Sequence, residues 1–174
     1  RLAAEPIYEV KTAFSYHAQL LAENITKVRT RVGEMREPPL ELDAVPEPAY
    51  ALFFDEILGA PTLEETLTGL FRVTFPALVE AIGAHRNQTN LLVDQPSVRV
   101  LKHLLLDLEE MMAWGGDTLD KPVAHAHLED RAAAWAAQFQ NYLTAAGGIS
   151  GGEPRPSPAP APLHSKAPFV YGSV

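Results

Sequence analysis

The chain has 174 residues, which is enough for one domain of ordinary size and a tail. Hydrophobic residues make up 47% and charged residues 21%, a balance typical of a globular chain that excludes disorder throughout. The net charge of −8 argues against a general nucleic-acid binder and against attachment to anionic lipid by charge, because both need a basic face. The absence of cysteine excludes a disulfide framework, a thiolate metal site and a cysteine nucleophile.

The hydrophobic residues are interrupted by charge too often to cross a membrane. No stretch approaches the roughly 20 apolar residues of a transmembrane helix, and the first residues do not form a secretory signal. The sequence does not name a compartment. It favours a soluble, cytoplasmic protein whose attachment to a membrane, if any, passes through a partner.

The first helix is predicted from about residue 6 to residue 36. Pro6 suits a first turn, and the Pro38-Pro39 pair ends the helix. Its apolar residues recur every three or four positions, as in a helix that packs in a bundle. They are Ile7, Val10, Phe14, Leu21, Val28, Val32 and Met35. Two polar residues, His17 and Asn24, fill gaps in this stripe.

A proline-rich linker then leads to a short helix and a long one. The short helix is predicted over residues 48–58. Thr62, with Glu65 three residues later, is a capping box that opens a helix from Leu63 to about Asn90. Pro76 lies inside this helix and should kink or split it.

Two further long helices follow. Asp94 is expected to cap a helix over residues 95–114, which ends at Gly115-Gly116. The last helix is predicted over residues 127–146 and is stopped by Gly147-Gly148. No segment alternates convincingly with the period of a strand. The predicted fold is therefore an all-α four-helix bundle with one additional short helix, formed by residues 1–146.

Residues 147–174 form an extended Gly/Pro-rich tail, because they hold too few apolar residues to pack a core of their own. Its proline run should adopt polyproline II, which orders at small entropic cost. Near its end the tail regains apolar character, and Phe169, Val170 and Tyr171 could anchor in a groove of a partner protein. The alternative is a flexible tail whose aromatic residues are incidental.

Histidines and carboxylates within the helical stripes are raw material for a metal site in a bundle. The candidate ligands are His17, His85, Glu109 and Glu110. The alternative is that each is a satisfied polar residue of the core or lies at a solvated helix end. Under the metal hypothesis the ion would be iron or manganese, and under the alternative the protein has no cofactor.

Two segments, SYHAQLLAENI at 15–25 and LLLDLEEMMAWG at 104–115, carry a resemblance to a known superfamily. Over about residues 6–146 the chain resembles the ferritin-like helical bundles in architecture. Di-iron members of that group carry two Glu-x-x-His motifs, whereas this chain has none. The resemblance therefore implies a non-catalytic relative.

Three functional hypotheses follow. The first is a non-catalytic structural or accessory subunit of a larger protein complex, in which the C-terminal tail docks on a partner protein. The second is a ferritin-like metalloprotein, an iron or manganese oxidase or oxygenase with a non-standard ligand set. The third is a carrier with a small-molecule cavity lined by Met111, Met112 and Trp114, although such a cluster is more often part of a core.

Overall fold

A computed structural model of the chain describes residues 5–35, 42–44, 47–120, 127–156 and 158–170. These residues form helices joined by turns and coil, and no strand occurs among them, which confirms the all-helical prediction. The contacts divide the chain into two compact units. The first comprises residues 1–42, 82–111 and 170–174, and the second comprises residues 43–81 and 112–169.

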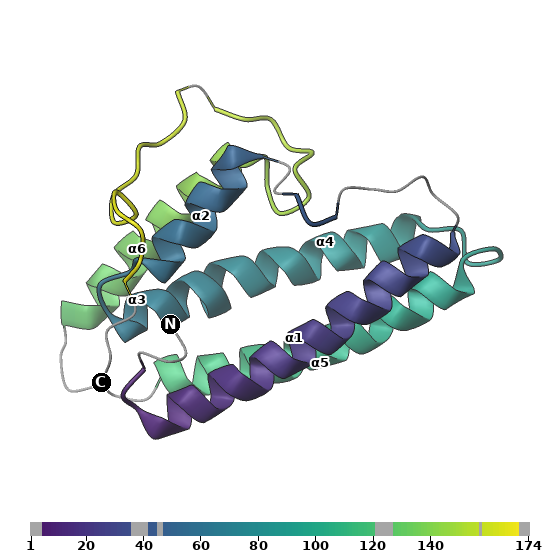
Figure 1. The fold of residues 1–174 in the computed structure, drawn as a ribbon, viewed down its shortest axis with the longest axis horizontal. Coiled ribbons are helices and arrows are strands. Elements are labelled where there is room, and N and C mark those ends of the chain that lie inside the picture. The colour runs from purple at the N-terminus through teal and green to yellow at the C-terminus, as the bar shows by residue number, and fades with distance from the viewer. Residues whose placement is uncertain (1–4, 36–41, 45–46, 121–126, 157, 171–174) are drawn as a thin grey trace. The chain divides into compact units, whose positions relative to one another are not determined.

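In the first unit, helix α1 (Tyr8–Glu34) lies beside the first part of helix α5 (Gln95–Leu119) (Figure 1). The two helices are antiparallel, because Arg31 near the end of α1 contacts Asp94 at the start of α5, while Tyr16 contacts Glu110. The bounds predicted for the first helix are confirmed to within two residues at each end.

The most buried seam of α1 is more polar than the sequence suggests. Its buried residues are Val10, His17 and Asn24, spaced by seven. The predicted apolar stripe flanks this seam, and its end residues Ile7 and Met35 are exposed. The two polar residues that fill gaps in the stripe are therefore closer to the centre of the packing than most of the stripe itself.

In the second unit, helix α2 (Pro48–Leu58) packs with helix α6 (His127–Ala145). The bounds predicted for the short helix are confirmed residue for residue. The main hydrophobic cluster combines apolar and aromatic side chains of both helices with Ala60 and with Val73 of the following helical segment. Its buried members are Phe53, Ile57, Ala60, Val73, Phe139, Tyr142 and Leu143.

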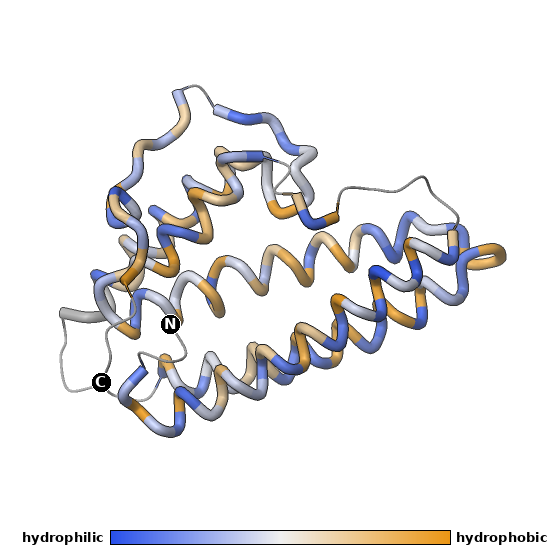
Figure 2. Tube along the Cα trace, viewed as in Figure 1, coloured by the Kyte–Doolittle hydropathy of each residue, from blue (hydrophilic) through white to orange (hydrophobic). Residues whose placement is uncertain are grey.

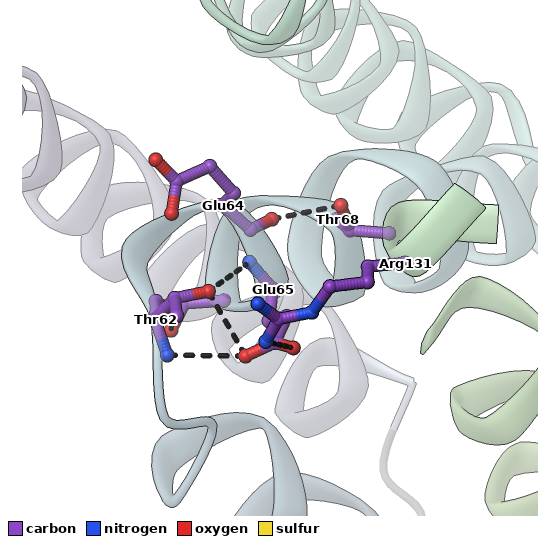
Figure 3. A network of polar contacts seen from close by, with 6 residues as sticks. Thr62, Glu64, Glu65, Thr68 and Arg131 are labelled. Carbon is purple, nitrogen blue, oxygen red and sulfur yellow. Dashed lines mark hydrogen bonds and ion pairs between the residues drawn. The ribbon is translucent and has the colours of Figure 1, made fainter. Parts of the chain in front are cut away.

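The capping box at Thr62 is formed as predicted. The Glu65 N–H donates to Thr62 Oγ1 at 3.3 Å, and the Thr62 N–H donates to Glu65 Oε2 at 3.1 Å (Figure 3). The other Glu65 oxygen accepts a hydrogen bond from Arg131 on α6 at 2.9 Å, so the buried carboxylate also joins two helices. A cap of this kind satisfies amide groups that the first helical turn leaves without partners.

From Leu63 the chain is helical without a break to Gln88, through α3 (Leu63–Leu67), the π-helical turn η2 (Thr68–Thr74) and α4 (Phe75–Gln88). The wider turn lies just before Pro76. There the Phe75 N–H donates to the carbonyl of Leu70, five residues back. A proline ring clashes with the carbonyl four residues earlier in a regular α-helix, so the predicted irregularity takes the form of a π turn.

The continuous helix of residues 63–88 is long and apolar enough to cross a membrane, by length and composition alone. Such a helix is not expected from the sequence, whose apolar stretches are interrupted by charged residues. Nearly half of the apolar window is buried inside the protein, as in the core helix of a soluble protein. The helix is therefore only a weak indication of a membrane span, and the fold is compatible with a soluble protein.

The predicted end of the helix over residues 95–114 is wrong, because α5 continues through Gly115-Gly116 to Leu119. Gly115 is buried against the ring of Phe71, which also contacts Trp114 with ring centroids 5.5 Å apart. The missing Cβ therefore serves close packing within the second unit rather than a helix end.

Gly115→Ala should destabilise the protein by about 1–3 kcal/mol, because the added Cβ would overlap the Phe71 ring. Gly116→Ala is the matched control, since a Cβ there meets nothing within 4 Å. It should raise the free energy of unfolding by up to about 1 kcal/mol through helix propensity. Urea unfolding of both variants measures the difference, and equal effects would contradict the close approach of Phe71.

Candidate functional site

The four predicted metal ligands are not gathered into a site. His17 is buried on α1, whereas His85 on α4 and Glu109 and Glu110 on α5 are exposed. Within the described ranges, no group of three or more His, Cys, Asp or Glu side chains could hold a metal ion. Of these four residues, His17 and Glu110 lie close enough for the charge of Glu110 to act on the imidazole.

His17 and Glu110 belong to a cluster on facing sides of α1 and α5. Burial lowers the pKa of His17 below its usual value, and the negative charge of Glu110 partly opposes this effect. The Tyr16 hydroxyl donates to Glu110 Oε1 at 3.3 Å, and the charge of Glu110, with a smaller contribution from burial, raises the pKa of Tyr16. A lowered histidine pKa favours a neutral imidazole at neutral pH.

Similar polar pairs recur at intervals of seven residues along α1. Asn24 is buried, and its Nδ2 donates to Asp107 Oδ2 at 2.6 Å. One heptad later, Arg31 donates to Asp94 at 2.9 Å and to Ser97 at 2.8 Å. We call the pairs His17/Glu110, Asn24/Asp107 and Arg31/Asp94 the polar ladder. Polar residues at buried heptad positions fix the register of paired helices at a cost in stability.

The Asn24/Asp107 pair gives a direct test of the polar ladder. Asp107→Ala should cost about 1–3 kcal/mol, because it leaves the buried amide of Asn24 without its acceptor. Replacing both residues by leucine should cost much less than the sum of the two single leucine replacements, since no polar group is then stranded. A double-mutant cycle by chemical denaturation measures this coupling, and additive effects would contradict it.

The carrier hypothesis receives no support from the positions of its three residues. Met111 is fully buried, Met112 is half-buried, and Trp114 packs against the Phe71 ring. The burial of Met111 and the ring contact of Trp114 are typical of core residues.

The second unit holds the C-terminal segment against its own helices. Residues 147–169, here named the arm, run back along α2 and α6 (Figure 1). The helix α6 is stopped at Gly147-Gly148 as predicted, and it ends in a Schellman motif with these glycines at φ of 87° and 71°. The Gly148 N–H donates to the carbonyl of Leu143 and the Gly147 N–H to that of Thr144, which turns the chain into the arm.

Side chains of both helices form hydrogen bonds and ring contacts with the arm at several points. The Tyr50 hydroxyl on α2 donates to the carbonyls of Gly148 and Ile149. On α6, the Tyr142 hydroxyl donates to the Ala161 carbonyl at 2.8 Å. Arg155 Nη1 forms an ion pair with Glu47 Oε2 at 2.8 Å. The rings of Trp135 and His164 pack together with their centroids 4.8 Å apart.

The strongest attachment of the arm is Glu56, a carboxylate of α2 with 0% of its surface exposed. It accepts hydrogen bonds from the backbone N–H groups of three consecutive arm residues, Leu163, His164 and Ser165, at 2.9–3.2 Å. The Ser165 hydroxyl adds a fourth donor at 2.5 Å. We call this arrangement the Glu56 clasp. Three successive amides and a hydroxyl turned toward one carboxylate form an anion-binding nest.

The Glu56 clasp keeps its carboxylate ionised although it is buried. Burial disfavours the charged form, but the hydrogen bonds from Ser165, His164 and Leu163 together outweigh it and lower the pKa of Glu56 below its ordinary 4.5. Both carboxylate oxygens accept hydrogen bonds from the arm. Its chemistry is therefore that of a structural anchor rather than of an acid or base.

Sequence reasoning missed Glu56. The only signal was its place in the apolar short helix, three residues after Phe53 and one before Ile57, on the face that becomes buried. A carboxylate at such a position needs donors from elsewhere in the chain. Those donors lie more than 100 residues away and show no pattern in the sequence.

Of the residues predicted to bind a partner, Phe169 is the last residue of the arm and Val170 follows it directly. Phe169 is half-buried, whereas 81% of Val170 is exposed. Tyr171 lies outside the described residues. The arm is thus attached to its own second unit as far as Ser165 and then leads to an exposed apolar residue.

Comparisons of this chain with protein families, with curated proteins and with solved structures found no match.

Glu56→Gln should release the arm and cost roughly 2 kcal/mol at pH 7, because an amide accepts fewer and weaker hydrogen bonds than a carboxylate. A group whose pKa is lowered by folding stabilises the protein above its unfolded pKa and loses this effect as the pH falls. The advantage of the wild type over Glu56→Gln should therefore shrink below about pH 4.5.

Thermal unfolding of both proteins between pH 7 and pH 3 measures this difference, with Glu153→Gln as the control for an exposed carboxylate of the arm. A wild-type advantage that is the same at every pH would contradict the ionised Glu56 clasp.

Proposed function

We propose that this protein is a non-catalytic accessory subunit of a larger protein complex, in which the end of the arm docks on a partner protein. The observation that carries the proposal is the Glu56 clasp, which fixes residues 163–165 and leads the chain to Phe169 and Val170. An arm that is already ordered loses less entropy on binding than a free tail. Its exposed apolar end can then contribute affinity to the contact with a partner.

The fold proposed for the subunit is a ferritin-like bundle without the di-iron site, acting as a soluble protein in the cytoplasm. Two features support this proposal: the antiparallel pairing of long helices α1 and α5, and the lack of any Glu-x-x-His motif. Glu65 and Glu56, the buried carboxylates of the second unit, are occupied by a cap with an ion pair and by the arm.

One observation favours a second candidate, a ferritin-like metalloprotein using iron or manganese. Buried His17 lies near Glu110, and imidazole and carboxylate are the ligand types such metals take. Elemental analysis of the gently purified protein tests this candidate. Stoichiometric metal that is lost in a His17→Ala variant would support it, and metal-free protein whose stability is unchanged by added metal would contradict it.

Truncation after Ser165 tests the docking role of the arm, because it removes Phe169 and Val170 but keeps every donor of the Glu56 clasp. This variant should keep the thermal stability of the full chain and lose most of its association with the native partner. Truncation after Gly148 should lose both. Quantitative mass spectrometry of proteins that co-purify with each form measures the association, and full retention of a stoichiometric partner after the shorter truncation would contradict the proposal.

A further inference from the structure

The turn between α4 and α5 carries three consecutive apolar side chains on the outside of the first unit. Leu91 is 55% exposed, Leu92 is 92% exposed and Val93 is 75% exposed. Figure 2 shows this turn in orange between the two helices. We call these three residues the apolar tip. Single exposed apolar residues are ordinary on protein surfaces, but three in succession at the end of a helical hairpin call for an explanation.

The backbone of the apolar tip is satisfied within the turn itself. The Leu92 N–H donates to Asn90 Oδ1 at 2.9 Å, and the N–H groups of Val93 and Asp94 donate to the Asn90 carbonyl at 3.2 and 3.0 Å. A turn that enters an apolar medium loses its hydrogen bonds to water, which is costly for unpaired N–H groups. Asn90 removes this cost for three successive donors.

The charge around the apolar tip is opposite in sign to the net charge of the chain. In residues 85–102, which flank the turn on α4 and α5, there are three cationic residues and one acidic residue: Arg86, Arg99 and Lys102 against Asp94. Asp94 is already paired with Arg31 of α1. Arg86 and Arg99 form no ion pair with any residue in the described ranges.

The next acidic residues of α5 lie too far from the apolar tip to cancel the charge of Arg86, Arg99 and Lys102. Asp107 and Glu110 are 13 and 16 residues beyond Asp94 on α5, which places them about 20 Å or more along the helix axis. Charges in water are largely screened beyond about 8 Å at physiological ionic strength. The local charge at the apolar tip therefore differs in sign from the net charge of −8, on which the expectation about anionic lipid is based.

We propose that the apolar tip docks on the surface of an anionic phospholipid membrane. Its three side chains enter the interface between headgroups and acyl chains, while the surrounding arginine and lysine side chains contact lipid phosphates. A protein partner fits less well, because a stable protein interface takes about 20 residues from each side whereas the apolar tip offers three. This attachment is independent of the arm, which belongs to the second unit.

The test is flotation of the full chain with vesicles of phosphatidylcholine, with and without phosphatidylglycerol. The wild type should float with the anionic vesicles and much less with the neutral ones. Because the chain has no cysteine, Leu92→Cys also gives a single site for an environment-sensitive fluorophore. Its emission should shift to shorter wavelength when anionic vesicles are added.

Two pairs of variants distinguish insertion of the apolar tip into the membrane from an effect of the net charge of the chain. Leu92→Asp should weaken binding by roughly tenfold or more, whereas Leu106→Asp, at a 60% exposed position on α5, should not. Arg99→Glu should weaken binding several-fold, whereas Lys11→Glu changes the net charge equally at the other end of the unit and should have little effect.

A wild type that stays out of the vesicle fraction, or a Leu92→Asp variant that floats as well as the wild type, would overturn the proposal. Light scattering of the wild type and of Leu92→Asp tests whether a second copy of this chain binds the apolar tip instead. A dimer that Leu92→Asp dissociates would assign the apolar tip to a contact between copies of this chain and would likewise overturn it.

Discussion

The position of the arm depends on one buried carboxylate. An ionised group that is removed from water costs several kcal/mol unless donors replace its hydration, and Glu56 on α2 is completely buried. Its donors are three backbone amides and a hydroxyl of residues 163–165, so the charge of the helix is satisfied only when the arm is in place. The amide groups of the arm depend on Glu56 in turn, because without it they would have only water as a hydrogen-bond acceptor. The two segments are therefore coupled, although 107 residues separate Glu56 from Leu163.

The polar ladder follows the same rule in the first unit. Helix α1 buries His17 and Asn24, and each is placed opposite a carboxylate of α5. Hydrophobic packing would tolerate several alignments of two such helices. In a wrong alignment, however, a buried polar residue of α1 would lose its hydrogen-bonding or charged partner on α5. In both units, buried polar groups thus select one arrangement of segments, and the apolar clusters supply most of the burial.

Local signals in the sequence predicted most of the helices but few of the contacts between distant segments. The capping box at Thr62, the bounds of α2 and the end of α6 at Gly147 depend on neighbouring residues and were predicted correctly. The end of α5 was not, because Gly115 is a helix breaker by local propensity and a packing residue against Phe71 in the structure. Among the candidate site residues, His17 and Glu110 were placed near each other, while Glu56 was missed because its donors come from a distant segment with no recognisable motif.

Hydrogen exchange of the backbone amides of Leu163, His164 and Ser165 in the full chain tests the central claim most directly. In a coil segment these amides would otherwise be among the fastest to exchange. If the Glu56 clasp holds the arm, they should be protected to nearly the same degree as amides in the middle of α6, because release would require opening of the second unit. Exchange at the rate of an unstructured peptide, with α6 still protected, would show that the arm is free and would contradict the account.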